Sequence, residues 1–185
     1  RPMTAKTALV ILGKGFEEIE ALAPVDLLRR AGVECTTASC EEERMVEGRS
    51  GIRVEADILI DEIAGRTFGC LVVPGGPGTM ALRQDSRVLD LVRAHHGEDK
   101  LIGAICAAPT VLLDAGVLPG IKYTGHVSIL SELPEIQEQA VVVDGRVLTS
   151  RGAGTAVDFG LALVAALVGQ EQADEVAASI HFTDD

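Results

Sequence analysis

A cysteine stands between an apolar run and a group of small residues in KLIGAICAAPT, residues 100–110. The apolar run predicts a buried strand, and the small residues predict a helix running from Ala107 to Ala115. A side chain at such a junction projects from the sheet edge, where the N–H groups of the helix start favour a thiolate. Cys106 is therefore a candidate nucleophile. Most free cysteines are small buried hydrophobic residues, however, and position alone does not separate the two interpretations.

A glycine-rich turn, PGGPG at residues 74–78, follows another apolar run. Its backbone can approach a ligand closely and turn N–H groups inward, as an oxyanion site requires. Glycine-rich turns after strands are common, so an ordinary turn is the alternative. The stretch is neither a phosphate loop nor a dinucleotide fingerprint, because it lacks GxxxxGK[ST] and GxGxxG.

Three carboxylates lie at the predicted start of the first helix, in GKGFEEIE. Glu17 and Glu18 fit the ordinary role of acids near a helix N-terminus. Glu20 is three residues from Glu17, so one of the two can face inward. A carboxyl group beside a thiol in a partly buried pocket has a raised pKa and can move protons. Spacing alone favours a surface charge for Glu20.

The histidines divide into two groups by their surroundings. His126 lies in the glycine-flanked loop YTGHVS, from which it could reach a site as a general base or hydrogen-bond partner, although loop histidines are mostly solvated. His95 and His96 close a predicted helix before Gly97, where a cation interacts favourably with the helix dipole. We interpret these two as structural.

The elements that must position these residues alternate along the chain. Continuous apolar runs predict strands covered on both faces, as in a parallel sheet; they span residues 7–12, 33–39, 70–74, 101–106, 140–145 and 147–150. Helical spacing is found in residues 17–32 and 85–97, with Gly32 and Gly97 as expected C-terminal caps, and a further helix is expected to start near Thr155.

Two hairpins complete the prediction. Residues 140–150 contain an Asp-Gly turn, and residues 46–57 resemble a short hairpin or extended excursion. The alternation without internal repeats predicts one doubly wound α/β sandwich over residues 1–185. Ligands bind such sheets at the carboxyl edge of the strands, where the candidate residues lie.

Composition narrows the function classes. The chain has 185 residues, 47% of them hydrophobic, and a formal net charge of −12, which argues against nucleic-acid readout through phosphate contacts. No apolar stretch approaches the roughly 20 residues that cross a bilayer, so we expect no membrane contact. No signal-peptide pattern opens the sequence, so we expect a cytoplasmic protein. The four cysteines show no metal-ligand spacing, so we expect free thiols and no metal. Residues 1–6, RPMTAK, are expected to be either a non-native or a short native extension.

Five motifs in this order resemble the ThiJ/PfpI superfamily, specifically its DJ-one branch of parkinsonism-associated, deglycase-like proteins. The matching stretches are ALVILGKGFEEIEALAPVDLLRRAGVECTTAS, LVVPGGPGT, LIGAICAAPTVLL, TGH and LTSRGAGTAVDFGLALVAALVG. The resemblance implies a flavodoxin-like three-layer sandwich with a mostly parallel sheet, a homodimer and no bound cofactor.

The resemblance also implies roles for individual residues. Cys106 is the reactive thiol and Glu20 the carboxylic acid that hydrogen-bonds its sulfur. The loop of Gly75 and Gly76, together with Ala107, supplies backbone N–H groups to an oxyanion. His126 lies beside the pocket.

Two departures from the family pattern limit what the resemblance implies. Gly48 stands about where animal members have a second cysteine, so a redox role that depends on that cysteine is not implied here. The loop PGGPGT is shorter than in some relatives, so the resemblance does not imply the structure of the pocket rim.

The implied function is a cofactor-independent cysteine enzyme of reactive-carbonyl defence. Its substrates are methylglyoxal, glyoxal or their adducts on proteins and nucleotides, and the reaction is that of a glyoxalase without glutathione or of a deglycase, through a hemithioacetal on Cys106. The alternative is an oxidative-stress sensor or redox-regulated chaperone, in which Cys106 is oxidised to a sulfinate. A cysteine peptidase is disfavoured because distant peptidase members place a histidine where this chain has Ala107.

Overall fold

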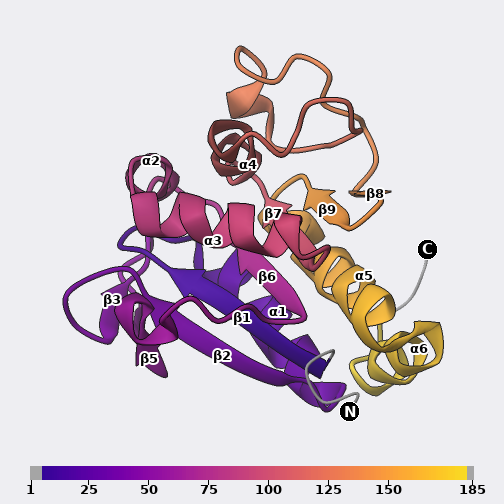
Figure 1. Ribbon diagram of the computed structural model, residues 1–185. Coiled ribbons are helices and arrows are strands. Elements are labelled where there is room, and N and C mark those ends of the chain that lie inside the picture. The colour runs from indigo at the N-terminus through magenta and orange to yellow at the C-terminus, as the bar shows by residue number, and fades with distance from the viewer. Residues whose placement is uncertain (1–5, 183–185) are drawn as a thin grey trace.

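A seven-stranded sheet lies between two layers of helices in the computed structural model, which describes residues 6–182 (Figure 1). The strands follow the order β5-β2-β1-β6-β7-β9-β8, and every neighbouring pair is parallel except β8 and β9. They are β1 (Thr7–Leu12), β2 (Glu34–Ser39), β5 (Ile58–Leu59), β6 (Cys70–Val73), β7 (Leu101–Ile105), β8 (Val141–Asp144) and β9 (Val147–Ser150). The predicted flavodoxin-like fold is confirmed. Of the expected extension at residues 1–6, only residue 6 lies within the described residues.

The continuous apolarity of the strands has the predicted cause, because each face of the sheet packs against helices. In β1, Leu9 and Ile11 contribute to one hydrophobic core while Ala8 and Val10 contribute to the other, and all four are fully buried. The first core is covered by α2 (Thr79–Arg83), α3 (Ser86–Gly97) and α4 (Pro109–Ala115). The second is covered by α1 (Glu18–Arg30), α5 (Ala156–Val168) and α6 (Gln170–Ser179).

Both predicted hairpins are present. Strands β8 and β9 pair antiparallel, with Gly145 at a φ of +59° in the turn. Strands β3 (Met45–Glu47) and β4 (Arg53–Glu55) form a separate two-stranded ribbon. Helices α2 and α6 and the two-residue strand β5 are not among the predicted elements. No helix within residues 6–182 is long and apolar enough to cross a membrane.

The ends of the first two long helices differ from each other. Gly32 follows α1 at a φ of +80°, as its predicted capping role requires. The prediction for Gly97 is wrong, because Gly97 is the last residue of α3 and the left-handed residue is Asp99, at a φ of +57°. The chain then turns so that the N–H of Lys100 donates to the carbonyl of His95 over 2.8 Å.

His95 is structural, as predicted, but for a different reason. Its ring is fully buried, Nε2 accepts the N–H of Phe68 at 3.0 Å, and Nδ1 lies 2.7 Å from the carbonyl oxygen of Leu91. An acceptor at one nitrogen and a donor at the other describe a neutral imidazole. Burial lowers the pKa of His95, so the expected favourable cation at this helix end is wrong for His95.

Replacement of His95 by glutamine is expected to lower the free energy of unfolding by about 1–3 kcal/mol, because the buried N–H of Phe68 loses a well-placed acceptor. In the unmodified protein the unfolded chain binds a proton at His95 near the ordinary pKa of 6.5, whereas the folded chain binds it only at lower pH. Stability is therefore lost as the pH falls below about 6.5, and urea titrations at two pH values measure this. The exposed neighbour His96, changed to glutamine, is the control; an equal effect there would contradict the assignment.

Candidate active site

Cys106 lies at a sharp turn between β7 and α4. It is one of the few residues other than glycine in the left-handed region, with a φ of +66°. Its N–H donates to the carbonyl of Ser150 at 2.9 Å, and its carbonyl accepts the N–H of His126 at 2.9 Å. Such a backbone conformation costs about 1–3 kcal/mol and persists only where the surroundings impose it. These two hydrogen bonds hold the backbone of Cys106 in that conformation.

Glu20 lies in the first turn of α1 and points inward. Its side chain is hydrogen-bonded to Cys106, and Oε1 accepts the N–H of Gly75 at 3.0 Å. The helix begins this way because Glu17 is the N-cap, and its Oε2 accepts the N–H of Glu20 at 2.8 Å. With an exposed fraction of 1%, Glu20 is no surface charge, and the spacing-based preference is wrong for this residue.

Cys106 and Glu20 form one electrostatic unit. Burial raises the pKa of Glu20 to about 7, against the opposing hydrogen bond to Cys106. Burial also raises the pKa of the Cys106 thiol, and an ionised Glu20 raises it further, while the N–H groups of Ala107 and Gly76 lower it. A proton on Glu20 removes the charge that opposes a thiolate. The pair therefore carries one negative charge above about pH 7.

A pocket of about 380 Å³ opens over the sulfur. Cys106, Gly76, Ala107 and His126 all contribute to its lining, so four of the residues singled out in the sequence come together; Glu20 lies behind the sulfur, and its hydrogen bond to Gly75 ties it to the glycine loop. The rest of the lining comes from Arg49, Pro77, Thr79, Met80, Arg83, Thr110, Ser128, Ile129 and Glu132. Within residues 6–182 no group of three or more His, Cys, Asp or Glu side chains could hold a metal ion.

His126 lines the pocket, and its ring makes contacts within its own loop. Nδ1 accepts the N–H of Ser128 at 3.1 Å and lies 2.9 Å from the Ser128 hydroxyl. These contacts cap the short 3-10 helix η3 (Val127–Ile129). The ring is thus oriented by its own loop, and its chemical role stays a prediction.

Sequence reasoning missed the part that Glu18 plays. Its side chain is 5% exposed, and Oε2 accepts the N–H groups of Ser50 and Ile52 at 2.9 and 3.2 Å. A Cβ at Gly48 would lie 2.5 Å from this carboxyl group, so a larger residue there would displace the Glu18 side chain. The contact fastens the turn of the β3–β4 ribbon to α1 and brings Arg49 to the pocket. A buried carboxylate next to a helix start leaves no signature in residue spacing.

The titration of Glu20 predicts a pH dependence. Alkylation of Cys106 by iodoacetamide, and any turnover that uses its thiolate, are expected to increase as the pH rises through about 7, because the neutral pair then becomes an anion. Stability changes the other way: the folded chain holds the Glu20 proton above the ordinary pKa of 4.5, so this contribution is lost as the pH rises from 4.5 to about 7.

Mass spectrometry of the alkylated protein across pH 5–9 measures the first effect. The step near pH 7 should disappear in Glu20→Gln and persist in His126→Gln, since histidine is the other side chain that titrates in this range. Loss of the step in His126→Gln alone would assign it to the histidine instead.

Comparisons with known proteins match most of the length of this chain. A family model described as the DJ-1/PfpI family matches residues 6–166. Protein dj-1beta of Drosophila melanogaster is 38% identical over 181 residues, which cover 95% of this chain and 97% of that protein. The glutathione-independent glyoxalase DJR-1.2 of Caenorhabditis elegans is 34% identical over 176 residues, covering 92% and 94%. The solved structure of oxidized Toxoplasma gondii DJ-1 superposes with a TM-score of 0.92 at 35% identity, over 96% of this chain and 99% of that one.

Proposed function

Because this chain belongs to the DJ-1/PfpI family, we propose that it is a cofactor-independent cysteine enzyme that acts on methylglyoxal, glyoxal or their adducts. The observation that carries the proposal is the hydrogen bond between Glu20 and Cys106 beneath the pocket. A nucleophile, a proton carrier and two N–H donors meet at one point there. The relative named as a glutathione-independent glyoxalase supports this class of reaction.

The first step is addition of the Cys106 thiolate to the aldehyde carbon of an α-oxoaldehyde. A C–S bond forms, the carbonyl π electrons move to oxygen, and the oxygen takes the proton held by Glu20, which gives a neutral hemithioacetal and leaves Glu20 ionised. Gly76 and Ala107 direct their N–H groups toward the sulfur, which places donors where the oxygen develops charge.

The second step is a proton transfer between adjacent carbons. Glu20, with a pKa of about 7, can take the proton from the former aldehyde carbon and return it to the neighbouring carbon. The product of this shift is a thioester, and water cleaves its C–S bond to release a hydroxy acid and the thiol. For methylglyoxal the sum is addition of one water to give lactate, without an external oxidant or reductant.

The test is lactate formation from methylglyoxal by the purified protein without glutathione. An adduct of methylglyoxal with N-acetylcysteine, supplied in the presence of a scavenger for the free aldehyde, distinguishes deglycation from consumption of free aldehyde. No lactate from either substrate would overturn the proposal.

The second candidate is a sensor of oxidative stress or a redox-regulated chaperone. It rests on the same N–H groups and Glu20, which could stabilise a sulfinate on Cys106. Intact-mass spectrometry after mild peroxide treatment separates the two functions. Selective oxidation of Cys106 together with absent carbonyl turnover would favour the sensor.

A further inference from the structure

Three segments form the walls around the Cys106 pocket, and one arginine connects them. Helix α2 follows the glycine loop, α4 follows the thiol, and residues 126–133 lie in the segment between α4 and β8. Arg83 is the final residue of α2 and lines the pocket itself. Its hydrogen bonds to α4 and to residues 126–133 therefore join one wall of the pocket to the other two.

The guanidinium of Arg83 is held by two carboxylates. Nε and Nη2 donate to the Asp114 carboxylate at 2.8 and 3.1 Å, while Nη1 and Nη2 donate to that of Glu132 at 2.8 and 2.7 Å. Four of its five N–H groups are thus engaged, in two fork-like pairs whose geometry is specific. The Arg83 side chain is only 15% exposed. Such a pair fixes orientation as well as distance.

The charges exclude an alternative role for Arg83 as a binding site for an anionic substrate group. One positive and two negative side chains leave the cluster with a net charge of minus one. Its donors already face carboxylates, so a substrate carboxylate would have to displace one of them. Arg83 therefore contributes to the pocket by positioning its walls and not by supplying a free positive charge.

We propose that Arg83 is a positioning residue that sets the width of the Cys106 pocket by holding the 126–133 segment against α4. Glu132 follows η3, and its own N–H donates to the carbonyl of Ile129, a residue of the pocket wall. Ile129 and Leu133 are buried in the same core as α4. Loss of Arg83 therefore loosens the wall without unfolding it, and larger groups gain access to the sulfur.

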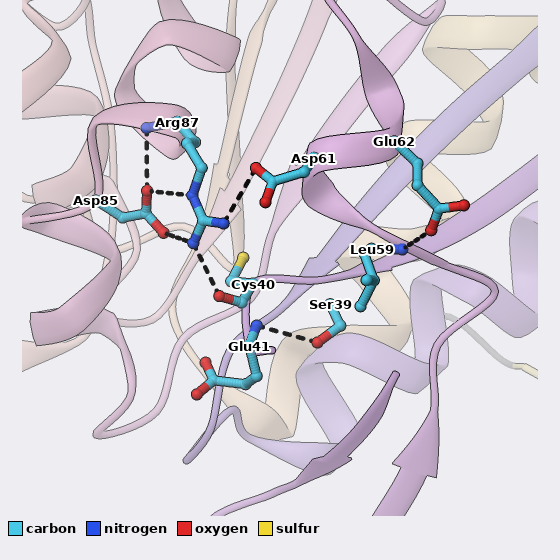
Figure 2. Close-up of polar contacts among 8 residues, drawn as sticks. All are labelled: Ser39, Cys40, Glu41, Leu59, Asp61, Glu62, Asp85 and Arg87. Atoms are coloured by element: carbon cyan, nitrogen blue, oxygen red, sulfur yellow. Dashed lines mark hydrogen bonds and ion pairs between the residues drawn. The ribbon is translucent and has the colours of Figure 1, made fainter. Parts of the chain in front are cut away.

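Arg87 provides a matched control, as Figure 2 shows. Its Nε and Nη2 donate to Asp85 at 3.0 and 2.7 Å, Nη1 donates to Asp61 at 3.3 Å, and Nη2 also donates to the carbonyl of Cys40 at 2.9 Å. This arginine also joins separate segments through several bonds. It lines a different pocket, beside Ile60 and Ile63 and not beside Cys106.

The inference rests on the proposed function for its kinetic test. Values of kcat/KM are measured for methylglyoxal and for the bulkier phenylglyoxal in the unmodified protein, Arg83→Gln, Glu132→Gln, Arg83→Lys and Arg87→Gln. The ratio of phenylglyoxal to methylglyoxal should rise about tenfold in Arg83→Gln and Glu132→Gln, a change typical of altered pocket fit. Arg83→Lys should restore part of the original ratio, and Arg87→Gln should leave it unchanged.

A second readout needs no turnover. The rates at which iodoacetamide and the larger N-phenylmaleimide label Cys106 are followed by mass spectrometry in the same proteins. The inference is supported if Arg83→Gln is labelled faster by the maleimide but not by iodoacetamide. If the unmodified protein makes no lactate, that finding overturns the proposed function and leaves this labelling test valid. Unchanged relative labelling in Arg83→Gln, or an equal change in Arg87→Gln, overturns the positioning role.

Discussion

Replacement of Cys106 by serine should reduce methylglyoxal turnover by about 10³-fold or more, since loss of a nucleophile removes the whole covalent route. A serine hydroxyl fills nearly the same volume at the turn, but it is far less acidic than a thiol and has no ionised form near neutral pH. The N–H groups of Gly76 and Ala107 would then face a neutral oxygen. Lactate formation, measured together with thermal unfolding, separates lost chemistry from lost structure.

Cys40→Ser is the matched control for this prediction. Cys40 is a buried free thiol, and its carbonyl accepts a hydrogen bond from Arg87, outside the Cys106 pocket. This variant should retain turnover. Turnover of Cys106→Ser within tenfold of the unmodified protein would remove Cys106 from the mechanism.

Gly75→Ala adds one methyl group at the site and should lower both the stability of the protein and the reactivity of Cys106. A Cβ at this position would lie 2.6 Å from Glu20 Oε1, 2.7 Å from the Cys106 Cβ and 2.7 Å from the Ile105 carbonyl oxygen. Two of these atoms are backbone or adjoin it, so the neighbours cannot swing away. Overpacking of this kind costs about 1–3 kcal/mol of unfolding free energy. It would also break the contact between Glu20 and Cys106, so the pH-dependent step in alkylation should vanish.

Gly97→Ala is the control for an added methyl group. Nothing lies within 4 Å of the position that its Cβ would take, and Gly97 belongs to a helix. The free energy of unfolding should rise by up to about 1 kcal/mol, because alanine loses less conformational freedom than glycine in a helix. Denaturant titrations of both variants give the comparison. Equal stability of Gly75→Ala and the unmodified protein would show that the loop can move aside.

The fold could be predicted because local patterns determine it. The strand around Leu9 is apolar on both faces, and only a sheet covered on both sides accommodates that pattern. The ends of elements were harder to place. The turn at Asp99 replaces the expected cap at Gly97. Asp99 adopts a positive φ although it is not glycine, and sequence patterns rarely predict such a residue.

The place of Cys106 at a turn and the loops around it could be predicted from the sequence, but their supporting contacts could not. The strand-to-helix junction at Cys106 is a local feature. The inward direction of Glu20 depends on how α1 docks, and residue spacing does not determine that. Arg83 meets Asp114 and Glu132 across 31 and 49 residues of sequence. Pairs this far apart are decided by the tertiary structure, so no local pattern reveals them.

The hydrogen bond from Cys106 to Ser150 has a consequence for biosynthesis. Strand β9 pairs with β7, so the carbonyl that supports the turn at Cys106 comes from a segment translated more than forty residues later. A nascent chain that has presented Glu20, Gly75 and Cys106 still lacks this support. The hydrogen bond that supports the turn at Cys106 therefore forms only after β9 has been synthesised and has paired with β7.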